Sequence, residues 1–182
     1  MLHFISTLRN EAMVGVNPEV AHEHMAGLSF VHGVAQAMES GKLFHIDLNA
    51  QRIGRFDQDL RFGSEDLKQA FLLVRLLEGT AGGERYEGPR HFDAHAYRTE
   101  DVEGVRDFAR GCMQTYLLLA ERARRFDADP EVREIIADRL EPEIDPLLSG
   151  DYSETRGAAL RALAQDLDAT AAEGLRYEAL HQ

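Results

Sequence analysis

The chain contains one cysteine, comparatively few basic residues and no long apolar run. A lone cysteine, Cys112, cannot form an internal disulfide, so we expect a reducing cytoplasm as the compartment. The chain has 32 acidic residues and only 20 Lys and Arg, so its net charge is −12. This charge would repel nucleic acid and anionic membranes. The apolar residues within 1–10 are too interrupted for a signal peptide or a membrane span. Cationic partners, divalent metal ions among them, suit this charge better.

The main pattern that is present is an alternation of short strands and long helices. Runs rich in β-branched or aromatic residues lie at 13–17, 43–48 and 90–94, and an acidic polar segment and then a helix-period segment follow each run. This order is typical of an α/β fold with about three parallel strands. The chain has 182 residues, 44% of them hydrophobic, which is enough for one compact domain with a core.

The helix-period segments predict where that core lies. Gly41 is expected to end the first helix and Ser64 to cap the second, while the third runs from about Val102 to Phe126. The core-facing positions expected in these helices are Leu28, Val31, Val34, Ala35 and Met38, then Leu67, Phe71, Val74 and Leu77, then Val105, Phe108, Cys112 and Leu119. The helical spacing therefore predicts a buried thiol at Cys112.

The pattern changes after the third helix. Asp129 and Pro130 predict the N-cap and first residue of a helix that reaches about Arg139, and the remainder is predicted to be helical as well. We therefore expect a partial (β/α) barrel over 1–127 and an all-helical C-terminal arm over 128–182. A closed eight-stranded barrel typically needs about 250 residues. The open sheet edges must be covered by the arm or by another chain.

Acidic residues cluster at the predicted carboxyl ends of the strands. Glu19 and His22 follow the first strand, Asp47 ends the second, Asp57 and Asp59 lie in the loop after it, and Asp93 ends the third. In a parallel βα arrangement these positions share one rim. Carboxylates gathered there would repel one another unless cations neutralised them, so the sequence predicts a divalent-metal site.

The ligand types favour hard cations. Carboxylate oxygens suit Mg²⁺ first and Mn²⁺ next, and the nitrogen of His22 also admits Co²⁺. Glu19 and His22 are three residues apart, which places both on one face of a helical turn. Asp57 and Asp59 are two apart, so in an extended loop both can point the same way. Any one of these residues alone is typical of a solvated strand end or a polar loop, so the prediction depends on their shared rim.

Four ordered motifs carry a resemblance to a known family. They read GVNPEVAHE at 15–23, KLFHIDLN at 42–49, FDQDLRFG at 56–63 and GPRHFD at 88–93. These segments resemble xylose isomerases of the actinobacterial type, and the likeness continues in order from about Leu2 to Tyr177.

The resemblance implies a TIM-type (β/α)₈ barrel, of which 1–127 would supply strands six to eight, and a helical arm that embraces a neighbouring subunit. It also implies interconversion of D-xylose and D-xylulose, and of D-glucose and D-fructose, by a 1,2-hydride shift assisted by two divalent metals. By resemblance, Glu19 bridges both ions, Asp47 and Asp93 hold the first, and His22, Asp57 and Asp59 hold the second.

The sequence also departs from the family. Barrel strands one to five have no counterpart in it, and with them are missing the ring-opening histidine–aspartate pair, a glutamate of the first metal site and a lysine. The aromatic walls of the sugar pocket are missing too, and the chain has no Trp. His95 stands where the family usually has lysine and is the candidate substrate-binding residue; His24 replaces a glutamine, and Ala21 and Ala50 replace glycines. No catalytic residue is assigned within this chain.

Three hypotheses remain open from the sequence. The chain is a metal-binding, self-assembling relative with little or no activity alone, an active isomerase through a composite site with another chain, or a purely structural assembly module. The expected partners are further copies in a dimer or tetramer, a full-length xylose isomerase or a separate N-terminal half, with no nucleic acid and no membrane.

Overall fold

The computed structural model describes residues 1–80 and 82–139. Contacts divide the chain into two units, Met1–Asp127 and Ala128–Gln182, and each is described by itself. The elements in chain order are α1 (Leu2–Ser6), the 3-10 helix η1 (Glu11–Met13), α2 (Val20–Met25), α3 (Phe30–Glu39), β1 (Ile46–Asp47), α4 (Leu67–Leu77), β2 (Arg90–His91), α5 (Val102–Ala128) and α6 (Pro130–Arg139). The role of 128–182 as an arm for subunit association stays a prediction.

The mixed α/β character of the first unit is confirmed. β1 and β2 are parallel neighbours, with Ile46 opposite Arg90 and Asp47 opposite His91. The prediction of a third strand at 13–17 is wrong for the described residues, because the chain there makes only isolated parallel bridges, Val16 with Leu43 and, further on, Glu19 with Asp47. Pro18 lies between these bridges and has no N–H to donate, so no continuous ladder forms.

The helices begin and end close to their predicted positions, with one correction. Ser64 does not cap α4; the N-cap is Asp66, whose Oδ1 accepts a hydrogen bond from the backbone N–H of Gln69 at 3.0 Å. The chain is still turning at Ser64, because Gly63 has φ +75° and Ser64 N–H donates to the carbonyl of Arg61 at 3.0 Å. An aspartate two residues later therefore takes the capping position.

The core lies where the helical spacing predicts it, except at helix starts. Val34, Val74, Leu77, Cys112 and Leu119 are buried as expected. Leu28, Leu67 and Val105 were expected inside but are 57%, 56% and 51% exposed. Each of these lies before or within the first turn of its helix, where the backbone has not yet reached the surface that it packs against.

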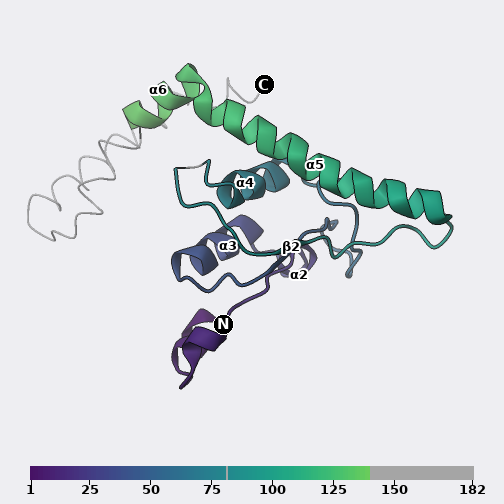
Figure 1. Cartoon of the computed structure of the whole chain (residues 1–182), viewed down its shortest axis with the longest axis horizontal. Helices are drawn as coiled ribbons and strands as arrows, with labels where there is room; N and C mark the ends of the chain where they lie inside the picture. The colour runs from purple at the N-terminus through teal and green to yellow at the C-terminus, as the bar shows by residue number, and fades with distance from the viewer. Residues whose placement is uncertain (81, 140–182) are drawn as a thin grey trace, which may run out of the picture. The chain divides into compact units, whose positions relative to one another are not determined.

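The helices α3, α4 and α5 lie in successive layers in the view of Figure 1. α3 packs against α4, and residues of both join Ile46 and Leu48 of the β1 region and Cys112 of α5 in one core cluster. Both β1-region side chains are fully buried, as is typical of a parallel strand covered by helices.

Polar contacts also join α4 to α5. Nε and Nη2 of Arg75 lie 2.8 and 2.6 Å from Oδ1 of Asp127. The hydroxyl of Tyr116 donates to Oε1 of Glu78 at 2.7 Å, and Nη2 of Arg90 lies 3.6 Å from the same oxygen. Burial, and next the hydrogen bond to Glu78, raise the pKa of Tyr116 well above its usual range. Both half-buried acids, Glu78 and Asp127, therefore have an arginine partner.

In the second unit, the described residues end with α6. Oδ1 of Asp129 accepts from the backbone N–H groups of Glu131 and Val132 at 2.9 and 3.3 Å, which confirms Asp129 as the cap and Pro130 as the first helical residue. The helices predicted beyond Arg139 lie outside the described residues. Among the helices in the described ranges, none is long and apolar enough to cross a membrane.

Candidate metal centre

Glu19 lies where the chain leaves its bridge to β1 and enters α2. It is the N-cap residue of α2, but its side chain makes no capping hydrogen bond. Instead the side chain, only 10% exposed, points to two polar neighbours, Asn49 after β1 and His22 in α2. Its Oε1 accepts a hydrogen bond from Nδ2 of Asn49 at 2.7 Å. Its other oxygen, Oε2, is thereby left facing His22.

His22 stands between two carboxylates. Its Nε2 lies 3.3 Å from Oε2 of Glu19 and 3.4 Å from Oδ1 of Asp57. One ligand atom from each of the three residues lies within 4.8 Å of the other two. Oδ1 of Asp57 is shielded from solvent and accepts no hydrogen bond from the described part of the chain. The structure thus brings together three of the predicted ligands around an unsatisfied oxygen.

The loop after β1 presents its two aspartates through an uncommon backbone conformation. Asp57 and Asp59 have φ values of +30° and +44°. Positive φ is rare for residues other than glycine and gathers at functional sites, where surrounding contacts hold it in place. The buried amide of Gln51 supplies such contacts: its Nε2 donates to the carbonyl of Arg55 at 2.6 Å, and its Oε1 accepts from the N–H of Gln58 at 2.8 Å.

Asn49 joins several of the predicted ligand segments and was given no role by the sequence analysis. Its side chain is buried, and Nδ2 donates toward Oε1 of Glu19, Oδ1 of Asp59 and the carbonyl of Asp93 at 2.7, 3.0 and 3.0 Å. Its Oδ1 accepts from the N–H of Ala21 at 2.9 Å. The signal in the sequence was its place two residues after Asp47, on the same side of the strand end.

Asp47 is buried at the end of β1 and lies outside the group formed by Glu19, His22 and Asp57. Its Oδ2 accepts from Nδ2 of Asn17 at 2.8 Å, and its Oδ1 is 3.0 Å from Nδ1 of His91. Nδ1 of His45 lies 3.5 Å from the same Oδ1. Both oxygens of Asp47 are therefore engaged by neighbouring side chains.

Asp93 and His95 lie at the margin of the centre. Asp93 is exposed and contributes its backbone carbonyl to Asn49. His95 donates its backbone N–H to the carbonyl of Asp59 at 3.1 Å, and its Nδ1 lies 4.0 Å from Oδ2 of Asp59. The imidazole is 66% exposed. Its assignment as a substrate-binding residue stays a prediction.

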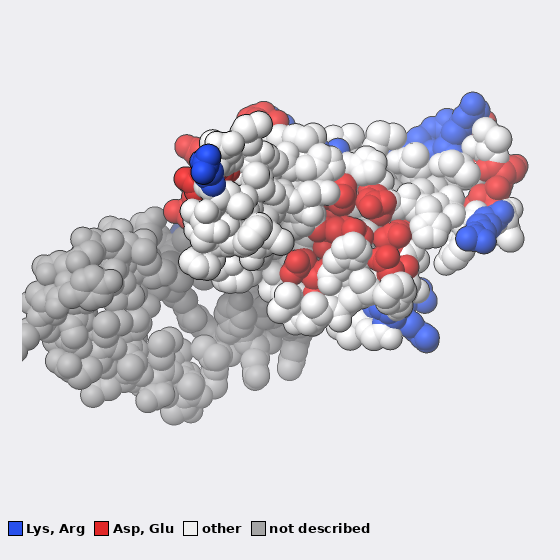
Figure 2. Space-filling view, turned by 90° about the horizontal axis from the view of Figure 1, so that it is seen from below, with Lys and Arg blue, Asp and Glu red and all other residues white. Residues whose placement is uncertain are grey.

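Burial and neighbouring carboxylates raise the pKa of Glu19 and of Asp59. Burial raises the pKa of Glu19, and the charges of Asp59 and Asp93 add to this against the opposing effects of Asn49 and His22. Burial likewise raises the pKa of Asp59, and the charges of Asp57 and Asp93 raise it further. Acidic side chains also gather visibly near the middle of the face shown in Figure 2. Among the described residues, no Lys or Arg forms an ion pair with Glu19, Asp57 or Asp59.

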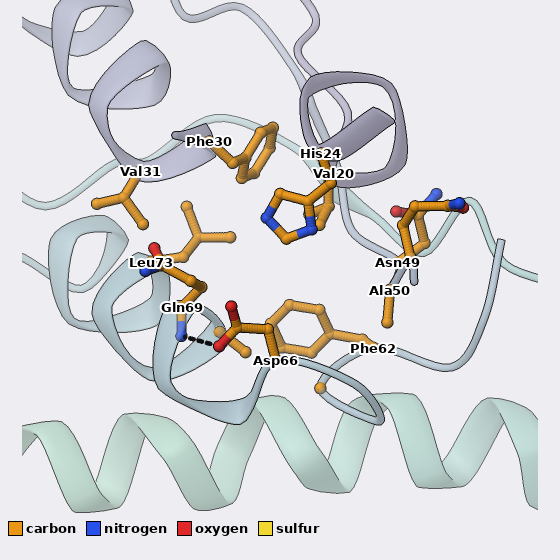
Figure 3. A pocket seen from close by; sticks show the side chains of 13 residues that line it. Val20, His24, Phe30, Val31, Asn49, Ala50, Phe62, Asp66, Gln69 and Leu73 are labelled. Atoms are coloured by element: carbon orange, nitrogen blue, oxygen red, sulfur yellow. Dashed lines mark hydrogen bonds between the residues drawn. The ribbon is translucent and has the colours of Figure 1, made fainter. Parts of the chain in front are cut away.

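A small apolar cavity lies behind the centre, between α2, α3 and α4. Its wall includes Val20, His24, Phe30, Asn49 and Leu73. In Figure 3 the rings of Phe30 and Phe62 and the imidazole of His24 surround the space. With a volume of about 20 Å³ it is large enough for about one water molecule. It is too small for a sugar.

The donor set fits a divalent cation. With bonds of about 2.1 Å, two ligand atoms at right angles around Mg²⁺ are about 3.0 Å apart, and the two observed separations around Nε2 of His22 are 3.3 and 3.4 Å. The orphaned Oδ1 of Asp57 supplies a free lone pair at that point. Two carboxylates and one imidazole are also an accepted ligand set for Mn²⁺ and Co²⁺. Glu19, His22 and Asp57 would hold the ion.

The fold and this centre define the class of protein: a parallel α/β chain with a cluster of carboxylates and one histidine beyond the strand ends. No family model matches the chain. A xylose isomerase of Thermus caldophilus is 56% identical over 184 aligned residues, which cover the whole chain and 46% of that protein. A xylose isomerase of Thermus thermophilus is 67% identical over 137 residues, 75% of the chain and 34% of that protein.

These matches confirm the predicted resemblance, and the chain is a relative of the xylose isomerases. It spans less than half the length of the curated relatives it matches. This coverage is consistent with the prediction that the chain corresponds to the C-terminal part of such a protein. The actinobacterial subtype stays a prediction.

Proposed function

We propose that this chain is a divalent-metal-binding relative of xylose isomerase, equivalent to the last barrel strands and the helical arm, with little or no isomerase activity alone. One observation carries the metal-binding part: Nε2 of His22 lies between Oε2 of Glu19 and the unsatisfied Oδ1 of Asp57. An imidazole nitrogen facing two carboxylate oxygens is stable only with a proton or a metal ion between them. Mg²⁺ is the first choice, and Mn²⁺ and Co²⁺ are alternatives.

We assign the candidate ligands to two metal sites. Glu19, His22 and Asp57 form the better supported site, to which the resemblance adds Asp59. Asp47 and Asp93 belong to a first site whose remaining carboxylate the chain does not supply. When bound, such an ion would supply Lewis-acid polarisation of a sugar carbonyl for a 1,2-hydride shift. The small cavity behind the centre is too small to be a sugar pocket. General acid–base help is worth about 10²–10⁴ in rate, so without a ring-opening base the isolated chain should be nearly inactive.

Calorimetry with Mn²⁺ tests metal binding. Wild type should bind, and Asp57→Ala should weaken binding at least about tenfold because it removes the unsatisfied ligand oxygen. Asp107→Ala is the matched control, since Asp107 is an exposed aspartate paired with Arg110 on α5. Identical flat titrations for wild type and Asp57→Ala would instead support a purely structural module.

Self-assembly is supported by exposed apolar side chains. Ile53 and Phe56, in the loop beside the metal centre, are 91% and 87% exposed, and Leu117 of α5 is 67% exposed. Further copies in a dimer or tetramer, a full-length xylose isomerase or a separate N-terminal half would cover such surfaces. Light scattering that shows a stable monomer across a concentration series would contradict self-assembly.

An active isomerase through a composite site is the second candidate, favoured by the 56% identity over the whole chain. Purified chain with Mg²⁺ or Co²⁺ and D-xylose should form no ketose unless a second polypeptide is added. Ketose formation by the chain alone, after trace host isomerase has been removed, would refute the proposal that the chain is inactive by itself.

A further inference from the structure

The side-chain amide of Asn49 contacts residues that follow each of the predicted strands. It lies beside Glu19 at the entry to α2, Asp59 in the loop after β1 and the carbonyl of Asp93 after β2. Asn49 is 1% exposed, so water cannot take over these contacts. If any one of these partners moved away, a buried polar atom would be left without a hydrogen bond, and the fold would lose stability.

The partners fix the orientation of the amide. The backbone N–H of Ala21 needs an acceptor, which is Oδ1 at 2.9 Å, so the nitrogen must face the opposite side. On that side the nitrogen has two hydrogens and three acceptors, Oε1 of Glu19 at 2.7 Å, Oδ1 of Asp59 at 3.0 Å and the carbonyl of Asp93 at 3.0 Å. Two of these acceptors therefore share one hydrogen.

This orientation decides which oxygen of each carboxylate is free. The amide occupies Oε1 of Glu19 and Oδ1 of Asp59. Oε2 of Glu19 is then the oxygen that faces His22, and Oδ2 of Asp59 is the one that faces His95. Being neutral, the amide holds both carboxylates without supplying a positive charge that would replace a cation.

From this geometry we infer that Asn49 is the positioning residue of the metal centre, which presents Oε2 of Glu19 to a divalent cation and holds Asp59 beside it. The inference rests on the proposed metal binding and adds to it. Partners of metal ligands typically change affinity by about 10–100-fold when they are removed. We expect a loss of this size for Asn49→Ala.

The test measures Mn²⁺ affinity and, separately, the visible absorption of bound Co²⁺, which reports the ligand geometry. Asn49→Ala should bind Mn²⁺ about 10–100-fold more weakly than wild type. Val74→Ala is the control for lost stability, since Val74 is buried in α4 and lines neither the centre nor the cavity. Its Mn²⁺ affinity should stay within about twofold of wild type.

A second variant separates positioning from a merely structural role. Asn49→Asp keeps an oxygen for the N–H of Ala21 and nearly the same volume, but it has no N–H to donate to Glu19 and Asp59. Its Co²⁺ spectrum should differ from that of wild type. Unchanged affinity in Asn49→Ala or an unchanged Co²⁺ spectrum in Asn49→Asp would overturn the inference while leaving the proposed function intact. A wild-type chain that binds no Mn²⁺ would overturn both.

Discussion

The half-buried acids between α4 and α5 have arginine partners, whereas the acids of the candidate metal centre have none among the described residues. Glu78 is paired with Arg85 and Arg90, and Asp127 with Arg75. Glu19 and Asp57 have only His22 as an ion-pair partner among the described residues. Arginines therefore neutralise the carboxylates in the first region, whereas the carboxylates of the second region lack positively charged partners in the described part of the chain. A deficit of this kind is expected where a cation from outside completes the structure.

The largest effect should come from breaking the neutralised interface. Glu78→Ala leaves Arg90 without its carboxylate and Tyr116 without its acceptor, which should lower the free energy of unfolding by about 3–5 kcal/mol. Urea unfolding in the presence of EDTA measures it. Glu78→Gln is the control, because it keeps an acceptor oxygen for the tyrosine. A loss well below this range would mean that the arginines do not depend on Glu78.

A smaller loss of stability is expected when the pair of Arg75 and Asp127 is broken. Arg75→Ala removes the hydrogen-bonded contacts to Asp127 and the stacking of the guanidinium over Phe126, whose ring centre lies 5.2 Å away. The free energy of unfolding should fall by about 1–3 kcal/mol. Thermal unfolding measures the change, with Arg124→Ala on the exposed side of α5 as the control. Neither Arg75→Ala nor Glu78→Ala should alter Mn²⁺ affinity, and a parallel loss of affinity would erase the distinction between the two regions.

The smallest change in stability is expected at the metal centre, where a substitution should stabilise the metal-free chain. Burial raises the pKa of Glu19 above its ordinary value of 4.5, so its stabilising contribution is fully present below that pH. It is lost as pH rises through the raised pKa. In EDTA at neutral pH, Glu19→Gln should therefore be more stable than wild type.

Thermal unfolding against pH, in EDTA, checks this prediction. The gap between Glu19→Gln and wild type should close as the pH falls toward and below 4.5, because the raised pKa means that Glu19 takes up its proton more readily in the folded chain. Saturating Mn²⁺ should reverse the order, because only wild type retains the negatively charged carboxylate as a ligand. A variant that is less stable than wild type in EDTA at every pH would show that Glu19 is already neutralised without metal.

Much of this arrangement could be predicted from the sequence, and the errors have local causes. The helical spacing correctly placed Cys112 and Leu119 inside. Of the six predicted ligands, the structure brings Glu19, His22 and Asp57 together, and their role in metal binding stays a prediction. The prediction of a strand at 13–17 was wrong because it followed the apolar run alone. Pro18, directly after that run, interrupts the ladder. Asn49 was overlooked because a neutral amide looks like an ordinary loop residue until its partners are known.

The sequence by itself determined the family resemblance, the acidic balance and the residue types available as ligands, because these depend only on the order of side chains along the chain. The tertiary structure decided which oxygens face one another. Asp57 and His22 are 35 residues apart in sequence, yet the turn through Gln51 and the positive φ of Asp57 place their ligand atoms 3.4 Å apart. Only packing against a common sheet end can fix such a distance, because no local spacing rule relates residues in separate loops.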